Sequence, residues 1–146
     1  MPLNQPDSTS DQPERTIRIA AALIDDDRGR LLLVRKAGTR WFMQAGGKIE
    51  AGEDPRSTLR RELREEIGLD VAETSLRYLG SCSAPAANEP RCTVEAELFH
   101  LRISQPPIAR AEIEEVRWVT PAEAERMALA PLTRDHVVPL ARDLFP

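Results

Sequence analysis

The sequence predicts an α/β fold, an α/β/α sandwich in which a mixed β-sheet lies between helices. Strand-like segments rich in Ile, Leu and Val are separated by clusters of Asp, Gly and Pro. The longest helical segment lies in mid-chain, with strand-like segments on both sides of it. A length of 146 residues is that of one domain that can bury a hydrophobic core.

The first elements follow a polar N-terminus. Residues 1–15 contain three prolines and almost no apolar side chain, which is typical of a flexible tail. The single domain is therefore expected to span residues 16–146. Its first strands are expected at residues 16–24 and 30–36, with Asp and Gly between them forming a hairpin turn. Residues 41–44 form a short apolar segment that is expected to enter a Gly-Gly loop.

The mid-chain helix has signals at both ends. Asp54 is a suitable N-cap, Pro55 suits the first helical position, and Gly68 suits the left-handed residue that ends a helix. The apolar stripe expected to hold this helix against the sheet consists of Leu59, Leu63 and Ile67.

The second half of the chain predicts further strands and two helices. Strands are expected at residues 75–84, 92–103 and 115–119, a short helix at residues 121–127, and a last helix after Thr133. With the longest helix in mid-chain, these elements complete the predicted sandwich.

Composition and charge exclude several function classes. The chain is 41% hydrophobic and 30% charged, as in an ordinary soluble globular protein. Its net charge of −4 gives no overall basic field, so neither a nucleic-acid polymer nor a membrane is an expected partner. Because the sequence has neither a signal-like leader nor a membrane-spanning apolar run, we expect a cytoplasmic location.

The two cysteines, Cys82 and Cys92, form no CxxC motif and have no neighbouring His pair, so zinc-site and redox motifs are not indicated. They flank a predicted loop and could face each other across a hairpin. Two free thiols are favoured over this disulfide, because thiols stay reduced in the cytosol.

Three glutamates lie close together on the mid-chain helix. Relative to Glu62, Glu66 is rotated by about 40° and Glu65 by about 60° in the opposite sense. A solvated amphipathic helix is the ordinary interpretation, but like charges at these spacings each cost a few tenths of a kcal/mol. Glu65 and Glu66 also lie near the negative end of the helix dipole, and only Arg61 with Glu65 forms a favourable i,i+4 pair. A helix selected for stability alone would not carry this arrangement.

A divalent cation would reverse this balance. Carboxylate oxygens on one helix face are the ligands that Mg²⁺ or Mn²⁺ prefers, and the metal charge converts repulsion into coordination. Gly46 and Gly47 allow a close approach of the backbone, so that a carbonyl can reach the metal and N–H groups can reach a phosphate. The pattern indicates hydrolysis or transfer at a phosphate ester or anhydride.

The segment from Gly47 to Leu69 resembles the signature of the Nudix family, Gx5Ex7REUxEExGU, in which U is a bulky aliphatic residue. All nine defined positions of this 23-residue motif are filled. The hairpin before the motif, the segment EVRWVTPAEAE after it and the closing helix also resemble a Nudix domain. One departure is Ala45, which stands where many members have proline.

The resemblance implies a Nudix-type fold and the hydrolysis, with Mg²⁺ or Mn²⁺, of a diphosphate linked to another moiety, usually a nucleoside. Glu62, Glu65 and Glu66 match the metal-ligating glutamates of the family. The carbonyl of Gly46 matches the backbone ligand just before the motif.

Other motif positions match supporting roles in the family. Glu53 matches a glutamate that assists the metal and its water network, and Arg61 matches an arginine that orients a motif glutamate. Gly47 and Gly68 match positions that need backbone freedom.

The general base is left open by the motif. In this family it is a motif glutamate or an acid from a later loop. Glu112, six residues before Trp118, is the candidate for the later acid, and Glu115 is the alternative. Ordinary surface positions would explain both residues equally well.

Few residues bear on the substrate. Pro85 lies sixteen residues after Leu69, a spacing similar to that of ADP-ribose hydrolases, although turn chemistry alone explains a proline here. Among the aromatic residues, Phe42 and Tyr78 are expected to pack in the core or on a strand, and Trp41 stays open as a base-stacking residue. Structural positions are expected for Trp118, His100 and His136.

Three functional hypotheses stay open. The first is a metal-dependent hydrolase of a nucleoside diphosphate linked to another moiety, acting by attack of water at phosphorus. The second is a nucleoside triphosphate pyrophosphatase that removes oxidised or non-standard nucleotides. The third is a non-catalytic nucleotide sensor, against which the complete motif argues. A small nucleotide is the expected partner, and a homodimer is an open alternative because many Nudix proteins form one.

Overall fold

The computed structural model describes residues 14–145. In chain order its elements are β1 (Arg15–Asp25), β2 (Leu31–Lys36), β3 (Phe42–Met43), β4 (Ala45–Lys48), α1 (Pro55–Ile67), η2 (Glu73–Ser75), β5 (Arg77–Pro85), β6 (Cys92–Arg102), β7 (Ile113–Val119), α2 (Pro121–Ala124), η3 (Thr133–Val137) and α3 (Val138–Leu144). Most of the predicted tail, residues 1–13, lies outside the described residues, and Arg15 already belongs to β1.

The strands form one mixed sheet, as predicted. Its order is β3-β2-β1-β6-β5, with β4 beside β1 and β7 beside β2. β1 and β6 are parallel from Arg15 opposite Cys92 to Asp25 opposite Arg102, and the other pairs are antiparallel. β1 and β2 pair only where Asp25 faces Leu31. The two strands therefore diverge from that end, and β4 pairs with the middle of β1.

The predicted Gly-Gly loop is wrong, because Gly46 and Gly47 lie within β4. In the antiparallel pair with β1, Gly46 is opposite Ala21. Gly46 has a φ of 146°, and a Cβ atom at this position would lie 2.2 Å from the carbonyl oxygen of Ala20. The glycine is therefore required by the close approach of the β1 backbone, a tertiary contact that leaves no local pattern in the sequence.

The central strands supply a hydrophobic cluster on each face of the sheet. In β1, Ala20, Ala22 and Ile24 belong to one cluster, whereas Ala21 and Leu23 belong to the other. Successive side chains of a strand point to opposite faces, so this alternation follows from strand geometry. Burial on both faces explains why the segment is a continuous apolar run.

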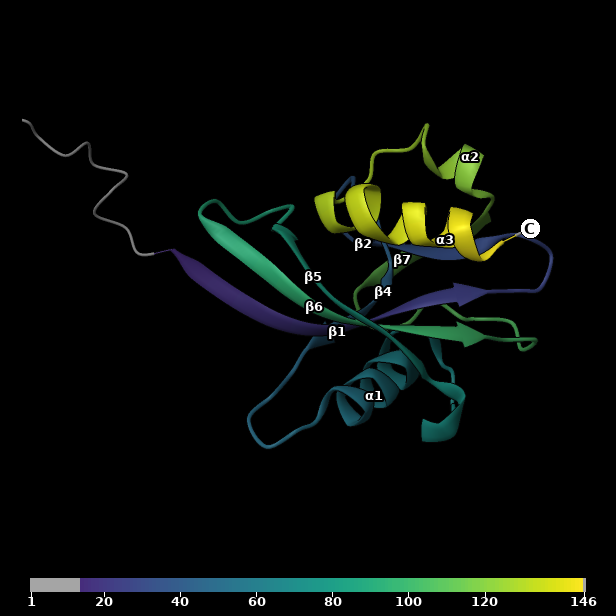
Figure 1. Ribbon diagram of the computed structural model, residues 1–146, viewed down its shortest axis with the longest axis horizontal. Coiled ribbons are helices and arrows are strands. Elements are labelled where there is room, and N and C mark those ends of the chain that lie inside the picture. Colours follow the sequence, from purple (N-terminus) through teal and green to yellow (C-terminus); the bar gives the residue numbers. More distant parts are fainter. Residues whose placement is uncertain (1–13, 146) are drawn as a thin grey trace, which may run out of the picture.

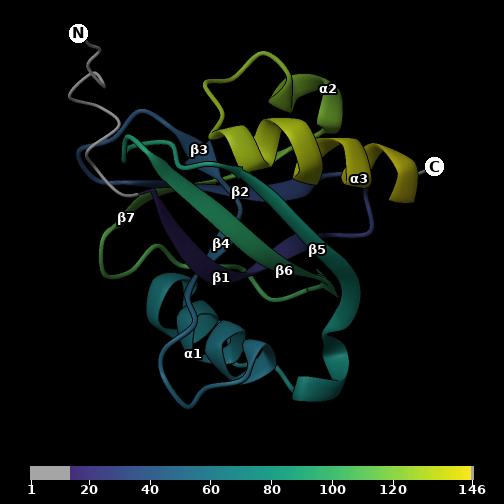
Figure 2. The ribbon, with the colours of Figure 1, turned by 60° about the vertical axis from the view of Figure 1, so that its left-hand side comes forward.

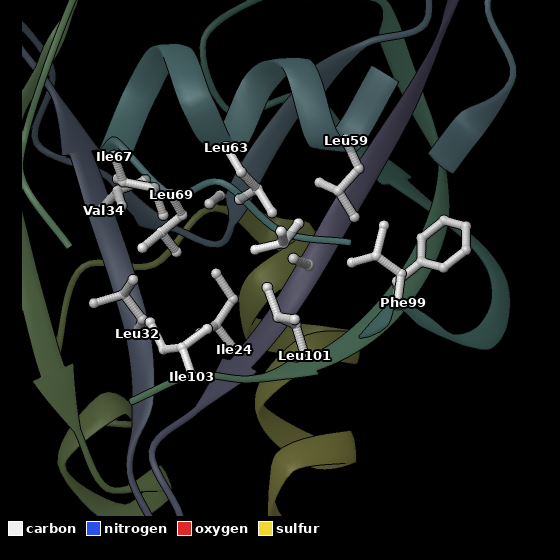
Figure 3. Packing of buried hydrophobic residues seen from close by; sticks show 14 of the residues in the cluster. Ile24, Leu32, Val34, Leu59, Leu63, Ile67, Leu69, Phe99, Leu101 and Ile103 are labelled. Atoms are coloured by element: carbon white, nitrogen blue, oxygen red, sulfur yellow. The ribbon is translucent and has the colours of Figure 1, made fainter. Parts of the chain in front are cut away.

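Helix α1 covers the first face of the sheet (Figures 1 and 2). The predicted stripe of Leu59, Leu63 and Ile67 is fully buried and points toward the sheet, where Ile24 and Leu32 belong to the same cluster (Figure 3). This packing fixes the rotation of α1, and with it the direction in which its charged side chains point.

Helices α2 and α3 cover the opposite face, which confirms the α/β/α sandwich (Figures 1 and 2). The turn η3 is π-helical and continues directly into α3, so the predicted last helix is present. Helix α2 is shorter than predicted, because the amides of Arg126 and Met127 bond to carbonyls three residues back and tighten its end. Among residues 14–145, no helix is long and apolar enough to cross a membrane.

A buried acid ties the ends of β1 and β6 together. Asp25 is 1% exposed and accepts hydrogen bonds from Arg102 Nη2 at 2.8 Å and Nε at 3.1 Å. His100 Nε2 lies 2.9 Å from Asp25 Oδ1, and His136 Nε2 lies 3.0 Å from the carbonyl oxygen of Ser83. Both histidines therefore have structural partners, as predicted.

Both cysteines are free thiols, as the sequence favours. Cys82 lies opposite Ala96 in the β5–β6 pair, whereas the backbone of Cys92 bonds to Ala86 beyond the end of that pair. The two residues are thus displaced along the hairpin rather than facing each other.

Candidate active site

Helix α1 presents its glutamates from a well-defined position. The Asp54 carboxylate caps the helix by accepting a hydrogen bond from the Ser57 amide at 2.9 Å, and Pro55 is the first helical residue. Gly68 ends the helix with a φ of 68°, and its amide bonds to the carbonyls of Arg64 and Leu63. The predicted cap residues are thereby confirmed.

Arg61 links three of the predicted site residues. Its Nε and Nη2 atoms donate to Glu53 at 2.8 and 3.0 Å. Its Nη1 atom donates to Glu62 at 2.8 Å and to Glu65 at 3.3 Å. The sequence indicates only the contact with Glu65, so the structure extends the role of Arg61 from one carboxylate to three.

Glu53 is held in the ionised state by several donors. The Arg61 guanidinium is the main cause, and the Glu50 amide and the Thr58 hydroxyl also donate to Glu53 Oε1 at 3.0 and 2.8 Å. Together they lower the pKa of the Glu53 carboxyl to about 2. Glu53 is therefore a fixed negative charge that orients Arg61 rather than a group that exchanges protons near neutral pH.

Glu62 points toward the glycines of β4. A Cβ atom at Gly47 would lie 2.3 Å from the carboxyl carbon of Glu62, so the carboxylate fills the space that a side chain at residue 47 would occupy. Burial raises the pKa of Glu62, and Arg61 opposes this shift. The strand glycine therefore makes room for a half-buried carboxylate.

Glu66 is the most deeply buried of the three glutamates, at 5% exposed. Burial, followed by the charge of Glu62, raises the pKa of Glu66 to about 7, against the lowering effects of Lys36 and the Gly46 backbone. Two carboxyl groups thus share a poorly solvated site. A structural helix gains nothing from this arrangement, because the ionised pair is destabilising.

The donor set fits a hard divalent cation in its chemistry. Glu62 and Glu66 offer only oxygen ligands, and a cation beside them would favour their ionised forms. Within residues 14–145, no three Asp, Glu, His or Cys side chains converge closely enough to hold a metal ion, and Arg61 bonds to Glu62 and Glu65. Glu65 is more than half exposed. Arg61 bonds to one oxygen of each of these two carboxylates, so Glu62 Oε1 and Glu65 Oε2 stay available to a cation.

The two candidate general bases lie on different sides of the sheet. Glu112 Oε1 lies 3.1 Å from Lys36 Nζ, and the Glu112 charge contributes to the raised pKa of Glu66. Glu115 pairs in register with Arg35, on the face where Leu33 packs under α3. The Arg117 guanidinium, 2.6 Å away, and Arg35 lower the pKa of Glu115. Only Glu112 is on the side of α1.

A cleft of about 190 Å³ adjoins Glu66. Its wall includes Gly46 and Gly47 of β4 and the charged side chains Lys36 and Lys48. The remaining lining residues come from β1, β2, the β3–β4 region, the β5–β6 hairpin and the segment before η3: Ile17, Ile19, Val34, Met43, Gln44, Pro85, Ala86, Ala87, Asn88, Glu89, Val94, Ala130 and Leu132. The cleft therefore extends from the acidic face of α1 towards the α3 side of the sheet.

Lys36, Lys48 and Gln44 are cleft residues that the sequence does not single out. No motif marks them, because the pairing of β2 and β4 with other strands brings Lys36 and Lys48 to the cleft, and Gln44 lies between the paired strands β3 and β4. Pro85 does line the cleft.

The aromatic candidates lie elsewhere. Phe42 is buried in the core as predicted, and Trp41 lines a different pocket beside α3. Tyr78 packs on a strand, which is the second predicted alternative: it lies on β5, with its ring centroid 5.4 Å from that of Phe99, and it is 50% exposed and donates to Glu97 at 2.6 Å. Trp118 is partly buried against the cluster under α1.

Comparison with known proteins identifies the family. The profile described as the NUDIX domain matches residues 15–141, which is most of the chain. The chain belongs to the Nudix family. The fold and the family that the motif implies are therefore confirmed.

Two curated relatives have similar sequences. An RNA pyrophosphohydrolase of Halorhodospira halophila is 31% identical over 113 residues, which cover 66% of this chain and 62% of the relative. A putative 8-oxo-dGTP diphosphatase 2 of Mycobacterium tuberculosis is 36% identical over 105 residues, covering 72% of this chain and 71% of the relative. The first relative is thus matched over less than two thirds of its length.

Solved structures share the fold. The solution structure of the E. coli ORF135 protein has a TM-score of 0.67 and 28% sequence identity, and the match covers 90% of this chain and 89% of that chain.

Proposed function

We propose that the protein hydrolyses a diphosphate linkage in a small nucleotide and that it requires Mg²⁺ or Mn²⁺. The observation that carries this proposal is the crowding of Glu62 and Glu66 against Gly46 and Gly47 at one end of a cleft. Two desolvated carboxylates are costly in a helix without a cation and useful in one that binds it.

The residues of this chain would divide the work as follows. Glu62, Glu65 and Glu66, with the Gly46 carbonyl, would hold the cation. When bound, a divalent cation supplies positive charge that offsets the charge developing on phosphate oxygens. Lys36 and Lys48 line the cleft and would bind the remaining phosphate oxygens.

Glu112 is our candidate for the general base. Its carboxylate would accept a proton from the water that attacks phosphorus, and the phosphate group on the other side of the anhydride would leave. Arg61, oriented by Glu53, would act as a positioning residue, because it holds the carboxylates of Glu62 and Glu65.

A nucleoside triphosphate pyrophosphatase is the second candidate within the same chemistry. The 36% identity to a putative 8-oxo-dGTP diphosphatase favours it. A non-catalytic sensor is disfavoured by the complete set of carboxylates. A cytoplasmic location is a further prediction that accompanies this proposal. Mg²⁺ and Mn²⁺ both stay open as the cation, and a homodimer stays an open alternative.

The test is release of phosphate or pyrophosphate from a panel of nucleotides, with each metal in turn. The panel includes ordinary and 8-oxo nucleoside triphosphates, dinucleoside polyphosphates, ADP-ribose and nucleotide sugars. We expect metal-dependent turnover that falls at least about 100-fold in Glu62→Gln, with a melting temperature no lower than that of the wild type. Turnover at the wild-type rate in this variant would contradict the metal-ligand assignment, and inactivity across the panel would favour the sensor.

A further inference from the structure

We propose that Gln44 selects the nucleobase of the substrate, by donating a hydrogen bond from its side-chain amide to an exocyclic carbonyl oxygen of the base. Thr133 fixes the orientation of that amide. The inference rests on the proposed function, since it assumes that the cleft beside Glu66 receives a nucleotide. It commits to bases with an oxo group, such as guanine, hypoxanthine and uracil, over bases with an amino group at the same position.

Gln44 is a buried polar residue in the wall of the cleft. It is only 7% exposed and lies between β3 and β4, next to the glycines that adjoin the glutamates of α1. Burying an amide without a hydrogen-bond partner is costly, so a glutamine in this position needs a reason. Apolar residues would fill the same space at lower cost.

The oxygen of the Gln44 side-chain amide is already hydrogen-bonded within the protein. The Thr133 hydroxyl, which is fully buried, donates to Gln44 Oε1 at 2.8 Å. This is the side-chain hydrogen bond that the structure gives Gln44, and it uses the acceptor of the amide. The donor Nε2, with two N–H groups, is left for another partner.

The donor half of the amide is open to the cleft. Among residues 14–145, no fully buried side-chain nitrogen or oxygen lacks a hydrogen-bond partner. Because Gln44 Nε2 makes no bond to a described residue, it is not sealed inside the protein. The opening that Gln44 lines is the cleft. A ligand in the cleft would therefore meet an N–H donor.

The position of this donor is rigid. The backbone beside Gln44 is clamped on the α3 side, because the Phe42 amide donates to the Ala128 carbonyl at 2.8 Å and the Ala130 amide donates to the Phe42 carbonyl at 3.0 Å. Thr133 begins the helical turn that leads into α3. A donor held by two elements loses little freedom when a ligand binds, so its hydrogen bond contributes to selectivity.

The cleft around this donor suits a flat ring. Ile17, Ile19, Val94 and Leu132 line it with apolar side chains, whereas the charged residues Lys36, Lys48 and Glu66 suit phosphates and a cation. A base enclosed by apolar walls exchanges its bonds to water for bonds to the protein. An exocyclic oxygen that faces Gln44 Nε2 accepts a hydrogen bond from it and so replaces the bond lost to water. An exocyclic amino group in the same place is itself a donor, so it forms no hydrogen bond with Nε2.

The test compares matched substrates that differ in the exocyclic group. For the wild-type protein, we expect kcat/KM for inosine triphosphate to exceed that for adenosine triphosphate by about tenfold, and uridine triphosphate to exceed cytidine triphosphate similarly. Where turnover is not seen, the dissociation constants of the same pairs are measured by calorimetry. Effects of a substitution on folding or metal binding change both values alike, so they do not alter the ratio of kcat/KM for the oxo nucleotide to that for the amino nucleotide.

Two variants separate recognition from structure. Gln44→Met keeps the size of the side chain and removes the donor, so the oxo-to-amino ratio should fall to about one. Gln44→Glu still accepts the Thr133 hydrogen bond but offers an acceptor to the cleft, so the ratio should invert. Gln105→Glu adds the same charge at an exposed residue and should leave the ratio unchanged.

The outcomes distinguish this inference from the proposed function. Hydrolysis without an oxo preference, or an unchanged ratio in Gln44→Glu, would overturn the role of Gln44 and leave the hydrolase proposal standing. Selective binding of the oxo nucleotides without turnover would support Gln44 and overturn hydrolysis. A wild-type preference for amino bases would mean that the amide presents its oxygen, and would also overturn the inference.

Discussion

The carboxylate of Glu62 occupies the space beside Gly47 that a Cβ atom would need, with only 2.3 Å between that atom and the carboxyl carbon. A residue of α1 and a residue of β4 are thus matched in shape. The contact joins the acidic face of the helix to the strand that lines the cleft. It also explains why a strand position holds glycine although its backbone conformation is open to other residues.

Alanine substitutions at the two glycines of β4 should have different effects, one on metal affinity and the other on stability. In Gly47→Ala the new methyl group meets the end of a flexible side chain, so we expect a folded protein whose Mn²⁺ affinity falls about 10- to 100-fold. In Gly46→Ala it meets the backbone of Ala20, so we expect a loss of about 3 kcal/mol or more in unfolding free energy. Calorimetry and urea unfolding measure the two effects. Equal stability losses in both variants would refute this distinction.

Lysine in place of Arg61 should weaken metal binding. A lysine keeps the charge but cannot reach Glu53, Glu62 and Glu65 with a planar fork of donors. We expect Arg61→Lys to lower Mn²⁺ affinity by about 10- to 100-fold, measured by calorimetry. Arg64→Lys is the matched control, since Arg64 is exposed on the same helix and pairs with Asp70. Similar losses in both variants would mean that helix charge, not the Arg61 contacts, sets the affinity.

The pKa of Glu66 predicts how the stability of the metal-free protein depends on pH. The folded-state pKa of about 7 is above the unfolded value of 4.5, so the folded protein binds the proton more tightly. The contribution is complete below about pH 4.5 and is lost as the pH rises towards about 7. It amounts to about 3 kcal/mol, and Glu66→Gln should lack this part of the pH dependence.

Urea unfolding with a chelator present, at pH 5 and pH 8, measures this effect. At pH 8 the Glu66→Gln variant should be more stable than the wild type, although it should have lost turnover. A variant that is less stable than the wild type at pH 8 would contradict the raised pKa.

Glu112 and Glu115 form a matched pair of acids for testing the general base. Glu112→Gln should lower kcat by about 100-fold, because Glu112 lies on the side of Glu66. Glu115→Gln should alter kcat by less than about twofold, since Glu115 pairs with Arg35 and Arg117 on the other face. An unchanged kcat in Glu112→Gln across the pH range would assign the base to a motif glutamate.

The sequence predicts those parts of the fold that local chemistry determines. The ends of α1 follow from Asp54 and Gly68, and its apolar stripe follows from helical periodicity. The motif identifies the carboxylates for the same reason, because all of them lie on one helix or just before it. The contact of Arg61 with Glu65 could likewise be read from their spacing.

Contacts between segments that are distant in the chain leave no local pattern in the sequence. Gly46 and Gly47 resemble a loop because the pairing of β4 with β1 leaves no local signal. Lys36 and Gln44 reach the cleft through strand pairing, and nothing around either residue marks it as a ligand-binding position. For Tyr78 the sequence leaves core and strand packing open, and the place of β5 at the edge of the sheet decides for a half-exposed position on a strand.

The parallel pairing of β1 with β6 has a consequence for how the protein folds. The paired residues are 77 positions apart in the chain, and α1 lies in the segment between them. During synthesis α1 leaves the ribosome before β6 does, so the part of the surface beneath α1 that β6 supplies is still missing. Closing so large a loop is slow, and folding on a millisecond-to-second timescale is typical of such topologies. Helix α1 can therefore pack against the complete sheet only after β6 has been synthesised and has paired with β1.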